Sequence, residues 1–186
     1  MNPTLTDTLE RLCNLLRSDS RRAGGEHSLL PVQFDALDYL HRCNRFSDTP
    51  MAVTEYLGQT KGTVSQTLKV LEKKGLIRKK PDTQDRRVTH LQLTDAGTAL
   101  LAHIQNDLTL AHAEHTLDPA QLARLQQDLN GLLNALLTAH GRRAFGVCKT
   151  CRYHQPQSDG GGYCQLVQQY LSPADAQRIC REHQQP

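Results

Sequence analysis

The sequence predicts a mainly α-helical body with one small β-hairpin, followed by a small cysteine-rich C-terminal segment. The chain has 186 residues, enough to bury a core, and only 4% of them are aromatic, with no Trp. This composition disfavours a β-sandwich, in which aromatic and β-branched residues are enriched. Leucines and alanines recur at helical spacing over most of the chain, whereas four of the six cysteines lie between residues 148 and 180.

A first helix is expected over about residues 3–22, because leucines recur there at steps of three and four and therefore share one face. These leucines are Leu5, Leu9, Leu12 and Leu16. Pro31 suits a first helical position and predicts the start of a second helix. Cys13 and Cys43 fall within apolar helical patterns, so both are expected to be small buried side chains.

Two short helices joined by a tight turn are expected next. The first covers residues 51–58 and ends at Gly58, a residue type that is common at helix C-termini. Thr60 is a suitable N-cap for the second helix, which ends at Gly75. The buried stripe of that second helix is predicted to be Val64, Leu68 and Leu71. This pair of helices has the pattern of a helix-turn-helix.

Residues 76–80 and 88–93 are expected to form two short strands, because the second run alternates in character and a polar loop, residues 81–87, separates them. A β-hairpin with a charged tip directly after a helix-turn-helix is a wing. The predicted fold class is therefore a winged helix-turn-helix.

Two long helices are expected beyond the hairpin. Thr94 is a suitable N-cap for a helix through Leu110, and Pro119 is a suitable start for another. Together with the first helix they carry more leucine than a small winged module can cover. The helices at about 3–22 and 95–140 are therefore expected to pair with those of a second copy in a homodimer.

These elements divide the chain into a body, residues 1–141, with a winged core at about 31–94, and a tail, residues 142–186. Residues 60–90 hold nine Lys and Arg against three acidic residues, in a chain with a net charge of +3. Such a local basic patch is the electrostatic footprint of a phosphate-binding surface. A solvated lysine-rich face would have the same composition.

The run from Pro50 to Gly97 carries a family resemblance. Its segments VTEYLGQTKGTVSQTLKVLEKKGLI, DRR at 85–87 and LQLTDAG at 91–97 resemble the MarR family of winged-helix bacterial transcription regulators. By layout the resemblance extends over roughly residues 5–140. It implies a triangular homodimer that binds a palindromic operator in double-stranded DNA and usually represses nearby genes.

The residues expected to contact DNA lie in the second helix of the motif and in the wing. A recognition helix enters the major groove with its N-terminal residues nearest the bases, where short or flexible hydrogen-bonding side chains are useful. Those side chains are Thr60, Lys61, Thr63, Ser65, Gln66 and Lys69. By the resemblance, Arg86 is the wing-tip residue that reaches into the minor groove, and Arg87 either pairs with Asp85 or contacts the DNA backbone.

The tail has a metal-site pattern, C-x2-C-x12-C-x15-C, formed by Cys148, Cys151, Cys164 and Cys180. Four thiolates are the number that a tetrahedral zinc site or an iron–sulfur cluster needs. Only the first two cysteines form a CxxC pair, and the wide spacing of the others favours a cluster, [4Fe–4S], over Zn²⁺. A metal-free thiol switch is a third interpretation.

The segments CKTCRYH, GGYCQL and ICREH of the tail resemble small cysteine-rich modules that carry an iron–sulfur cluster in accessory subunits of certain glycyl-radical enzymes. His154 lies three residues after Cys151, and His183 lies three residues after Cys180. Either histidine could replace a thiolate, support the site from outside, or be only a polar neighbour.

The sequence therefore predicts a sequence-specific DNA-binding transcription regulator, a repressor, whose DNA binding is modulated by an iron–sulfur cluster or metal in the tail. One alternative is a repressor of the same type with a purely structural zinc tail and a small-molecule inducer bound between the dimerisation helices. Another is an electron-carrying or interaction module docked on the helical body. No nucleophile–base pair, phosphate loop or pair of carboxylates occurs in a convincing setting, so we do not expect an enzyme.

The chain has no run of about 18 apolar residues, and its first 20 residues lack the charged start and apolar core of a secretory signal. A cytoplasmic protein without membrane contact is therefore expected. In that reducing compartment, six cysteines are expected to be thiols or metal ligands rather than disulfides.

Overall fold

The computed structural model describes residues 3–83, 85–114 and 116–186. Residues 1, 2, 84 and 115, which fall within the predicted body and its hairpin loop, lie outside the described residues. The helices of the body are α1 (Leu5–Gly25), α2 (Pro31–Arg42), α3 (Pro50–Leu57), α4 (Lys61–Lys73), α5 (Asp95–Asn106), α6 (Thr109–Glu114) and α7 (Pro119–Ala139). The hairpin strands are β1 (Ile77–Pro81) and β2 (Thr89–Leu93).

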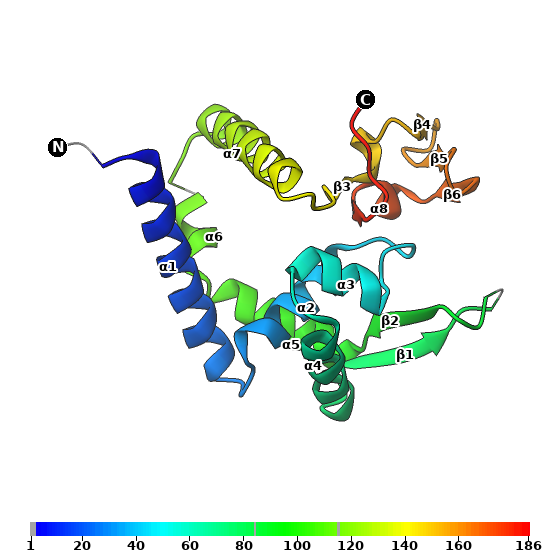
Figure 1. Ribbon diagram of the computed structural model, residues 1–186, viewed down its shortest axis with the longest axis horizontal. Coiled ribbons are helices and arrows are strands. Elements are labelled where there is room, and N and C mark those ends of the chain that lie inside the picture. Colours follow the sequence, from blue (N-terminus) through cyan, green and yellow to red (C-terminus); the bar gives the residue numbers. More distant parts are fainter. Residues whose placement is uncertain (1–2, 84, 115) are drawn as a thin grey trace.

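The core of the body lies between α2, α3, α4, α5 and the base of the hairpin, which projects away from these helices (Figure 1). The predicted apolar stripe of α4 is confirmed, since Val64, Leu68 and Leu71 are all buried. Cys43 is also buried, as expected. The strands β1 and β2 pair antiparallel, with Ile77 opposite Leu93. The winged helix-turn-helix fold predicted for the body is therefore observed.

The predicted helix caps are confirmed at three positions. Thr60 accepts a hydrogen bond from the N–H of Thr63 at 3.1 Å, and Thr94 accepts one from the N–H of Gly97 at 3.0 Å. Gly58 ends α3 with a φ of 62°, in the left-handed region that glycine adopts without strain. These short-range signals place the turn between α3 and α4, and the start of α5, as the sequence predicts.

α1 differs from its prediction in length and in the environment of Cys13. It continues to Gly25 instead of ending near residue 22, and its buried residues are Ala23 and Gly24 in the last turns. Cys13 was expected to be buried and is exposed. The reason is that α1 packs on its own protomer only near its C-terminal end.

The helix predicted from Thr94 through Leu110 is interrupted. α5 ends at Asn106 and α6 begins at Thr109. Asp19 of α1 accepts hydrogen bonds from the N–H of Thr109 at 2.6 Å and from its hydroxyl at 3.0 Å. A carboxylate supplied from α1 therefore satisfies free donors at the start of α6, which stabilises a new helix start at this point.

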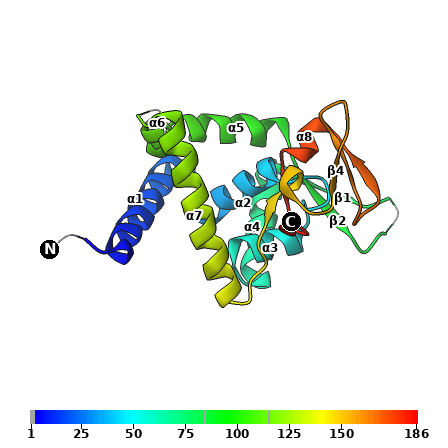
Figure 2. The same ribbon diagram turned by 90° about the horizontal axis from the view of Figure 1, so that it is seen from above.

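α7 stands apart from the core, and α1 reaches the core only through Ala23 near its C-terminal end (Figures 1 and 2). No residue of α7, the whole of which the structure describes, is buried. The large exposed leucines of the two helices are Leu5, Leu12, Leu15, Leu16, Leu125, Leu129, Leu133 and Leu136. Despite these leucines, no helix in the described ranges is long and apolar enough to cross a membrane.

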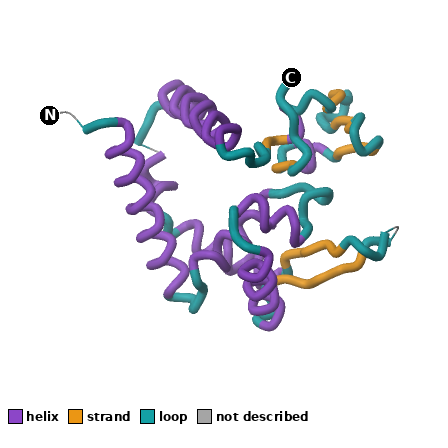
Figure 3. Tube along the Cα trace, viewed as in Figure 1, coloured by secondary structure: helices purple, strands orange, loops and turns teal. Residues whose placement is uncertain are grey.

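The tail consists of short elements, with little helix (Figure 3). They are β3 (Gly146–Val147), the 3-10 turn η1 (Cys148–Thr150), β4 (His154–Pro156), β5 (Gly162–Cys164), β6 (Gln169–Leu171), α8 (Pro173–Ala176) and β7 (Ile179–Cys180). The strands β4, β5 and β6 form an antiparallel sheet, and β3 pairs with β7. Within the tail, the buried hydrophobic side chains are Cys148, Leu171 and Ala176.

The tail packs against α3, on the side of that helix away from α4 (Figure 1). The loop between α2 and α3 also contacts it, through a parallel bridge between Cys43 and Ile179. The tail therefore lies beside the helix-turn-helix rather than at the end of a free linker.

Candidate nucleic-acid interface and four-cysteine site

The exposed face of α4 carries the side chains that the sequence predicts to contact DNA. Lys61, Thr63, Ser65, Gln66 and Lys69 are all exposed. Thr60 is exposed as well, but its hydroxyl caps the helix and lies 2.9 Å from the hydroxyl of Thr63. The core side chains of α4 point the opposite way. The structure thus brings the predicted residues together on one polar, basic face, with Thr60 committed mainly to holding the helix start.

The two arginines of the wing tip, Arg86 and Arg87, have different surroundings. Arg87 donates to both carboxylate oxygens of Asp85, at 2.9 and 2.8 Å, and its backbone N–H donates to the same carboxylate at 3.0 Å. These hydrogen bonds lower the pKa of Asp85. Of the two interpretations left open for Arg87, pairing with Asp85 is therefore the one observed within the protomer. Arg86 is exposed at the tip.

His90, which sequence reasoning did not single out, ties the base of the wing to the body. Its Nδ1 lies 2.5 Å from Asp48 of the α2–α3 loop, and its Nε2 lies 3.1 Å from Asp82. Burial alone would lower the pKa of His90, but the hydrogen bonds and charges of the two carboxylates outweigh it and raise the pKa. Asp48 and His90 are 42 positions apart, so no local pattern could have linked them.

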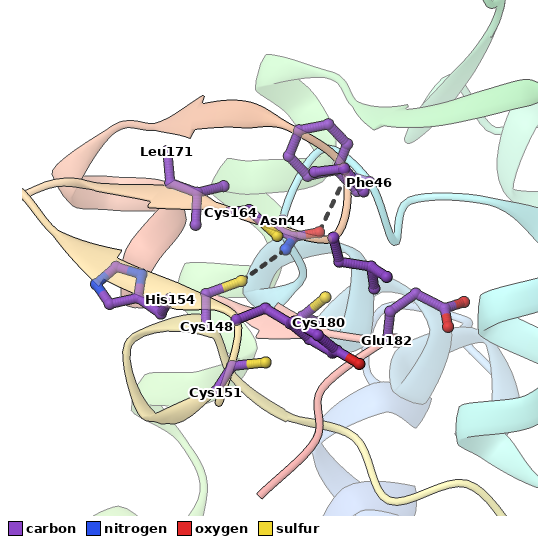
Figure 4. A pocket seen from close by; sticks show the side chains of 12 residues that line it. Asn44, Phe46, Cys148, Cys151, His154, Cys164, Leu171, Cys180 and Glu182 are labelled. Atoms are coloured by element: carbon purple, nitrogen blue, oxygen red, sulfur yellow. Dashed lines mark hydrogen bonds between the residues drawn. The ribbon is translucent and has the colours of Figure 1, made fainter. Parts of the chain in front are cut away.

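The four cysteines of the tail converge on one cavity, of about 30 Å³ (Figure 4). Their sulfur atoms approach it from η1, from the end of β5 and from β7 (Figure 4). Apolar side chains, among them Phe46 and Leu171, complete its wall. The structure therefore brings together Cys148, Cys151, Cys164 and Cys180, which the spacing alone could only propose as a set.

Local backbone geometry positions the CxxC pair. The N–H of Cys151 donates to the carbonyl of Cys148 at 3.0 Å and closes the tight η1 turn. Cys148 is anchored in turn by its own N–H, which donates to the carbonyl of Arg178 at 3.1 Å. Pairing of β3 with β7 sets Gly146 opposite Cys180. Residues from both ends of the tail thus meet at the cavity.

Several hydrogen-bond donors point at the sulfur atoms. The side-chain amide of Asn44 lies 3.0 Å from the sulfur of Cys148, and the N–H of Gln184 lies 3.5 Å from that of Cys151. A hydrogen bond from Cys148 lowers the pKa of Cys180, although burial opposes this change. The same interaction, together with burial, raises the pKa of Cys148. Within this pair Cys180 is therefore the more easily ionised thiol, and the thiolate is the form that binds metals.

The two histidines of the tail have different surroundings. His154 lines the cavity, and its Nδ1 is buried without a hydrogen-bond partner among the described residues. Its ring lies so close to Gly162 that a Cβ there would come within 2.0 Å of it, which explains the glycine. His183 instead lies 3.0 Å from the hydroxyl of Thr150 and does not line the cavity. His154 is thus placed to support the site, whereas His183 is not.

All four cysteines line the same cavity. Over the described part of the chain, no three His, Cys, Asp or Glu side chains are arranged to hold a single metal ion. A tetrahedral zinc site needs four ligands at about 2.0–2.3 Å from one ion. The described side chains therefore do not already stand in the positions of a tetrahedral site.

Ion pairs join the tail to the helix-turn-helix. Arg181 donates to both oxygens of Glu55 in α3, at 2.7 and 2.8 Å. Arg45 of the α2–α3 loop pairs with the buried carboxylate of Asp175 at 2.8 Å. Sequence reasoning missed both pairs, because each joins residues more than a hundred positions apart. They hold the cavity against the α2–α3 loop.

Residues 27–88 match the family model described as the MarR family. The matched residues include α2, α3, α4 and β1, that is, the helix-turn-helix and the first strand of the wing. The chain is similar to the HTH-type transcriptional regulator PecS of Dickeya dadantii (strain 3937), with 28% identity over 132 residues, which are 66% of this chain and 80% of PecS.

Solved structures support the same fold for the body. The chain is similar to a MepR mutant from a multidrug-resistant S. aureus clinical isolate, with a TM-score of 0.62 and 22% identity over 73% of this chain and 99% of that one. It is also similar to S. aureus MepR in a complex with DNA, with a TM-score of 0.58 and 21% identity over 72% of this chain and 99% of that one. Both comparisons leave more than a quarter of this chain unmatched.

Proposed function

We propose that this protein is a sequence-specific DNA-binding transcription regulator that represses genes from a palindromic operator in the cytoplasm. The main support is the joint exposure of the polar face of α4 and of Arg86 at the wing tip, within a basic region. A helix for the major groove and an arginine for the adjacent minor groove are thereby presented by one protomer. The likeness to MepR, which has been solved in a complex with DNA, supports this interpretation.

The regulator acts as a homodimer. The support is the row of exposed leucines on α1 and α7, together with the absence of any buried residue in α7, which is described over its full length. Two copies packed through these leucines would bury the apolar faces of α1 and α7 against each other. Two recognition helices held about 34–36 Å apart would then match two half-sites of a palindrome.

Replacing Arg86 tests the DNA-binding proposal. Arg86→Ala is expected to weaken operator binding about tenfold or more, because a minor-groove contact and a phosphate-facing charge are lost together. Affinity is measured by fluorescence anisotropy on a duplex selected from a random library. Arg152→Ala removes an equal charge from the tail and serves as the control. Equal affinities of the two variants would contradict the wing assignment.

We further propose that the tail of each protomer holds a [4Fe–4S] cluster on Cys148, Cys151, Cys164 and Cys180, and that the cluster modulates DNA binding. Each thiolate of such a cluster binds a different iron, so the sulfur atoms surround a larger body instead of meeting at one ion. The four thiols line one cavity and reach it from separate segments of the tail, which supports the proposal (Figure 4). When bound, the cluster would supply a centre that responds to iron and oxygen.

Other features of the cavity fit a cluster. Asn44 and the backbone N–H of Gln184 both donate to cysteine sulfur atoms. Hydrogen bonds to the sulfurs, together with burial, are the protein's means of tuning such a cluster. Phe46 and Leu171 add apolar side chains to the wall of the same space. The Nδ1 of His154, buried and unpartnered among the described residues, is a further polar group placed beside the site.

Purification without oxygen tests the cluster. The expected product is brown, with about four iron and four sulfide per protomer. Cys148→Ser is expected to remove the visible absorbance, whereas Cys13→Ser removes a thiol far from the cavity and is expected to keep it. A colourless protein with one zinc per protomer would overturn the cluster and leave a structural zinc tail in its place.

A second candidate for the signal is a small-molecule inducer. A cavity of about 1010 Å³ lies between α3, α7 and the tail, lined by Tyr56, Leu133 and Phe145 among others. Its volume is at the upper end of those seen for ligand sites. In this candidate the tail is a structural zinc site and the inducer releases the operator. Protection of the protein against thermal unfolding by phenolic compounds, in a form without the cluster, would favour it.

A further inference from the structure

The loop between α2 and α3 contacts the four-cysteine site on one side and the wing on the other. We call residues 44–48 the connecting loop. On its tail side, the side-chain amide of Asn44 donates to the sulfur of Cys148 at 3.0 Å, and the N–H of Asn44 donates to the carbonyl of Ile179 at 2.9 Å. The hydroxyl of Ser47 accepts from the N–H of Arg181 at 2.9 Å. Both Asn44 and Ser47 are only 1% exposed.

On its other side, the connecting loop holds the wing. The carbonyl of Asp48 accepts from the N–H of Leu91 in β2 at 2.7 Å, and its carboxylate lies 2.5 Å from His90. His90 reaches onward to Asp82 at 3.1 Å. Asp82 in turn accepts from the N–H of Asp85 at 2.7 Å, at the start of the wing tip. Hydrogen bonds thus continue from Asp48 to the residue that precedes Arg86.

The connecting loop itself is internally braced. The side-chain oxygen of Asn44 accepts from the N–H of Phe46 at 3.0 Å, and its backbone carbonyl accepts from the N–H of Ser47 at 3.0 Å. Asn44 therefore uses its amide on Cys148 while its two oxygens shape the loop. Because Asn44 is buried, an amide that loses its sulfur acceptor is left without water to replace it, and the loop must adjust.

We infer that the connecting loop transmits the state of the four-cysteine site to the wing of the same protomer, through Asn44 on one side and Asp48 with His90 on the other. This inference rests on the proposed function. With the cluster in place, Cys148 is held as a ligand and Asn44 keeps its acceptor, so the wing stays in the position that presents Arg86 to DNA. Removal of the cluster would leave Cys148 free to rotate, so its hydrogen bond with Asn44 would weaken and the wing would be less well placed for the minor groove.

A different route would pass through α7, which precedes the tail in the chain, and would change the spacing of the two recognition helices in the dimer. The contacts favour the connecting loop, since it touches both a cysteine ligand and the wing directly. The two routes differ in which variants should abolish the coupling between the four-cysteine site and DNA binding.

The test compares operator affinities of the cluster-loaded protein and of the same protein after the cluster is removed with a chelator under oxidising conditions. The probe is a duplex selected from a random library on the cluster-loaded wild type. Wild type is expected to bind at least about fivefold more tightly when loaded. In Asn44→Ser and His90→Gln, the ratio of operator affinities with and without the cluster is expected to fall towards one. Each change removes a contact at one end of the connecting loop.

The control is Gln92→Ala. Gln92 lies in the same strand as His90 but forms no hydrogen bond with the connecting loop, all of which the structure describes, so this variant is expected to keep the wild-type ratio of operator affinities. Absorbance of every loaded variant shows whether the cluster is retained. His90 does not line the cavity, so His90→Gln is expected to keep the cluster fully and remains informative even if Asn44→Ser lowers cluster content.

A second measurement follows the wing directly. In wild type, amide hydrogen exchange at Val88, whose N–H donates to Asp85 within the wing tip, is expected to be faster after cluster removal. The inference would be overturned if His90→Gln kept the wild-type ratio of operator affinities with and without the cluster. It would also be overturned if wild type, fully loaded at the start, bound the operator equally well after cluster removal. Absence of any cluster, or of operator binding, would instead refute the proposed function on which it rests.

Discussion

The body and the tail of this protein are ordered by different physical means. The body has a continuous hydrophobic core in which Leu37, Leu68 and Leu71 are fully or almost fully buried. In the tail, Leu171 and Ala176 are the buried aliphatic side chains, and the elements are strands of two or three residues. Hydrophobic burial is therefore enough to define the first region, whereas the second has few buried apolar side chains and is held by contacts with the body.

The two regions also have different roles in the proposed function. The body presents α4 and Arg86 for DNA, and the tail gathers four thiols around one cavity. They meet at the connecting loop and at α3, through contacts such as Arg181 with Glu55. Changes made in one region should therefore affect the other only when they touch this junction.

The largest effect is expected in the body core. Leu37→Ala should lower the free energy of unfolding by about 2–5 kcal/mol, because it removes a buried side chain and leaves a cavity. Urea unfolding followed by circular dichroism measures the change. Leu30→Ala, at a leucine that is 61% exposed, is the matched control and should change stability by less than about 0.5 kcal/mol. Equal losses in the two variants would show that the core is not where the structure places it.

A large effect confined to the tail is expected from metal removal. After chelation, trypsin should cleave at Lys149, Arg152 and Arg178, because the tail has too small an apolar core to remain ordered alone. Helical circular dichroism of the body should persist. Limited proteolysis with mass spectrometry locates the cuts. If the tail stayed resistant to trypsin after complete metal loss, its packing against the body would be enough to keep it ordered. The proposed difference between the body and the tail would then be wrong.

An intermediate effect is expected at the junction. Arg181→Ala breaks a two-point ion pair with Glu55 in which the arginine side chain is 20% exposed, and should cost about 1 kcal/mol. Arg143→Ala is the control, since Arg143 lies 3.8 Å from the same carboxylate and is 52% exposed. Hydrogen exchange in the tail should rise more for the first variant. A larger rise for the second would place the docking contact elsewhere.

The smallest effect is expected from pH at the base of the wing. Asp48 and Asp82 raise the pKa of His90 against the effect of burial, so its protonated form stabilises the fold; this stability is complete below about pH 6.5 and is lost as pH rises through the raised value. Burial raises the pKa of Asp48, although the hydrogen bond and charge of His90 oppose this change. Ionisation of Asp48 therefore also lowers the stability as pH rises. Thermal unfolding between about pH 6 and 8 should show this fall, and a smaller one in His90→Gln. An identical slope in the two proteins would mean that His90 does not titrate with folding.

Features that depend on neighbouring residues were predicted well. The caps at Thr60 and Thr94, the turn at Gly58 and the buried stripe of α4 all follow from signals within a few positions of one another. The predictions fail where another part of the chain intervenes. Asp19 of α1 starts α6 at Thr109, so one long helix becomes two.

The error at Cys13 has a related cause. The apolar periodicity of α1 predicts a face to be buried, but it does not specify the partner that covers it. Within the protomer α1 is buried only at its C-terminal end, and its leucine stripe remains exposed together with Cys13. A pattern in one chain cannot distinguish burial inside a protomer from burial between two copies.

The order and type of the elements in the body, and the set of four cysteines in the tail, follow from the amino-acid sequence alone, because helix periodicity, capping and cysteine spacing all act over short distances along the chain. Which distant groups meet is visible only in the folded protein. The amide of Asn44 reaches Cys148 across 104 positions, and His90 reaches Asp48 across 42. Such contacts arise from the packing of the tail on the body and of the wing on the connecting loop, and no residue in either segment identifies its partner in advance.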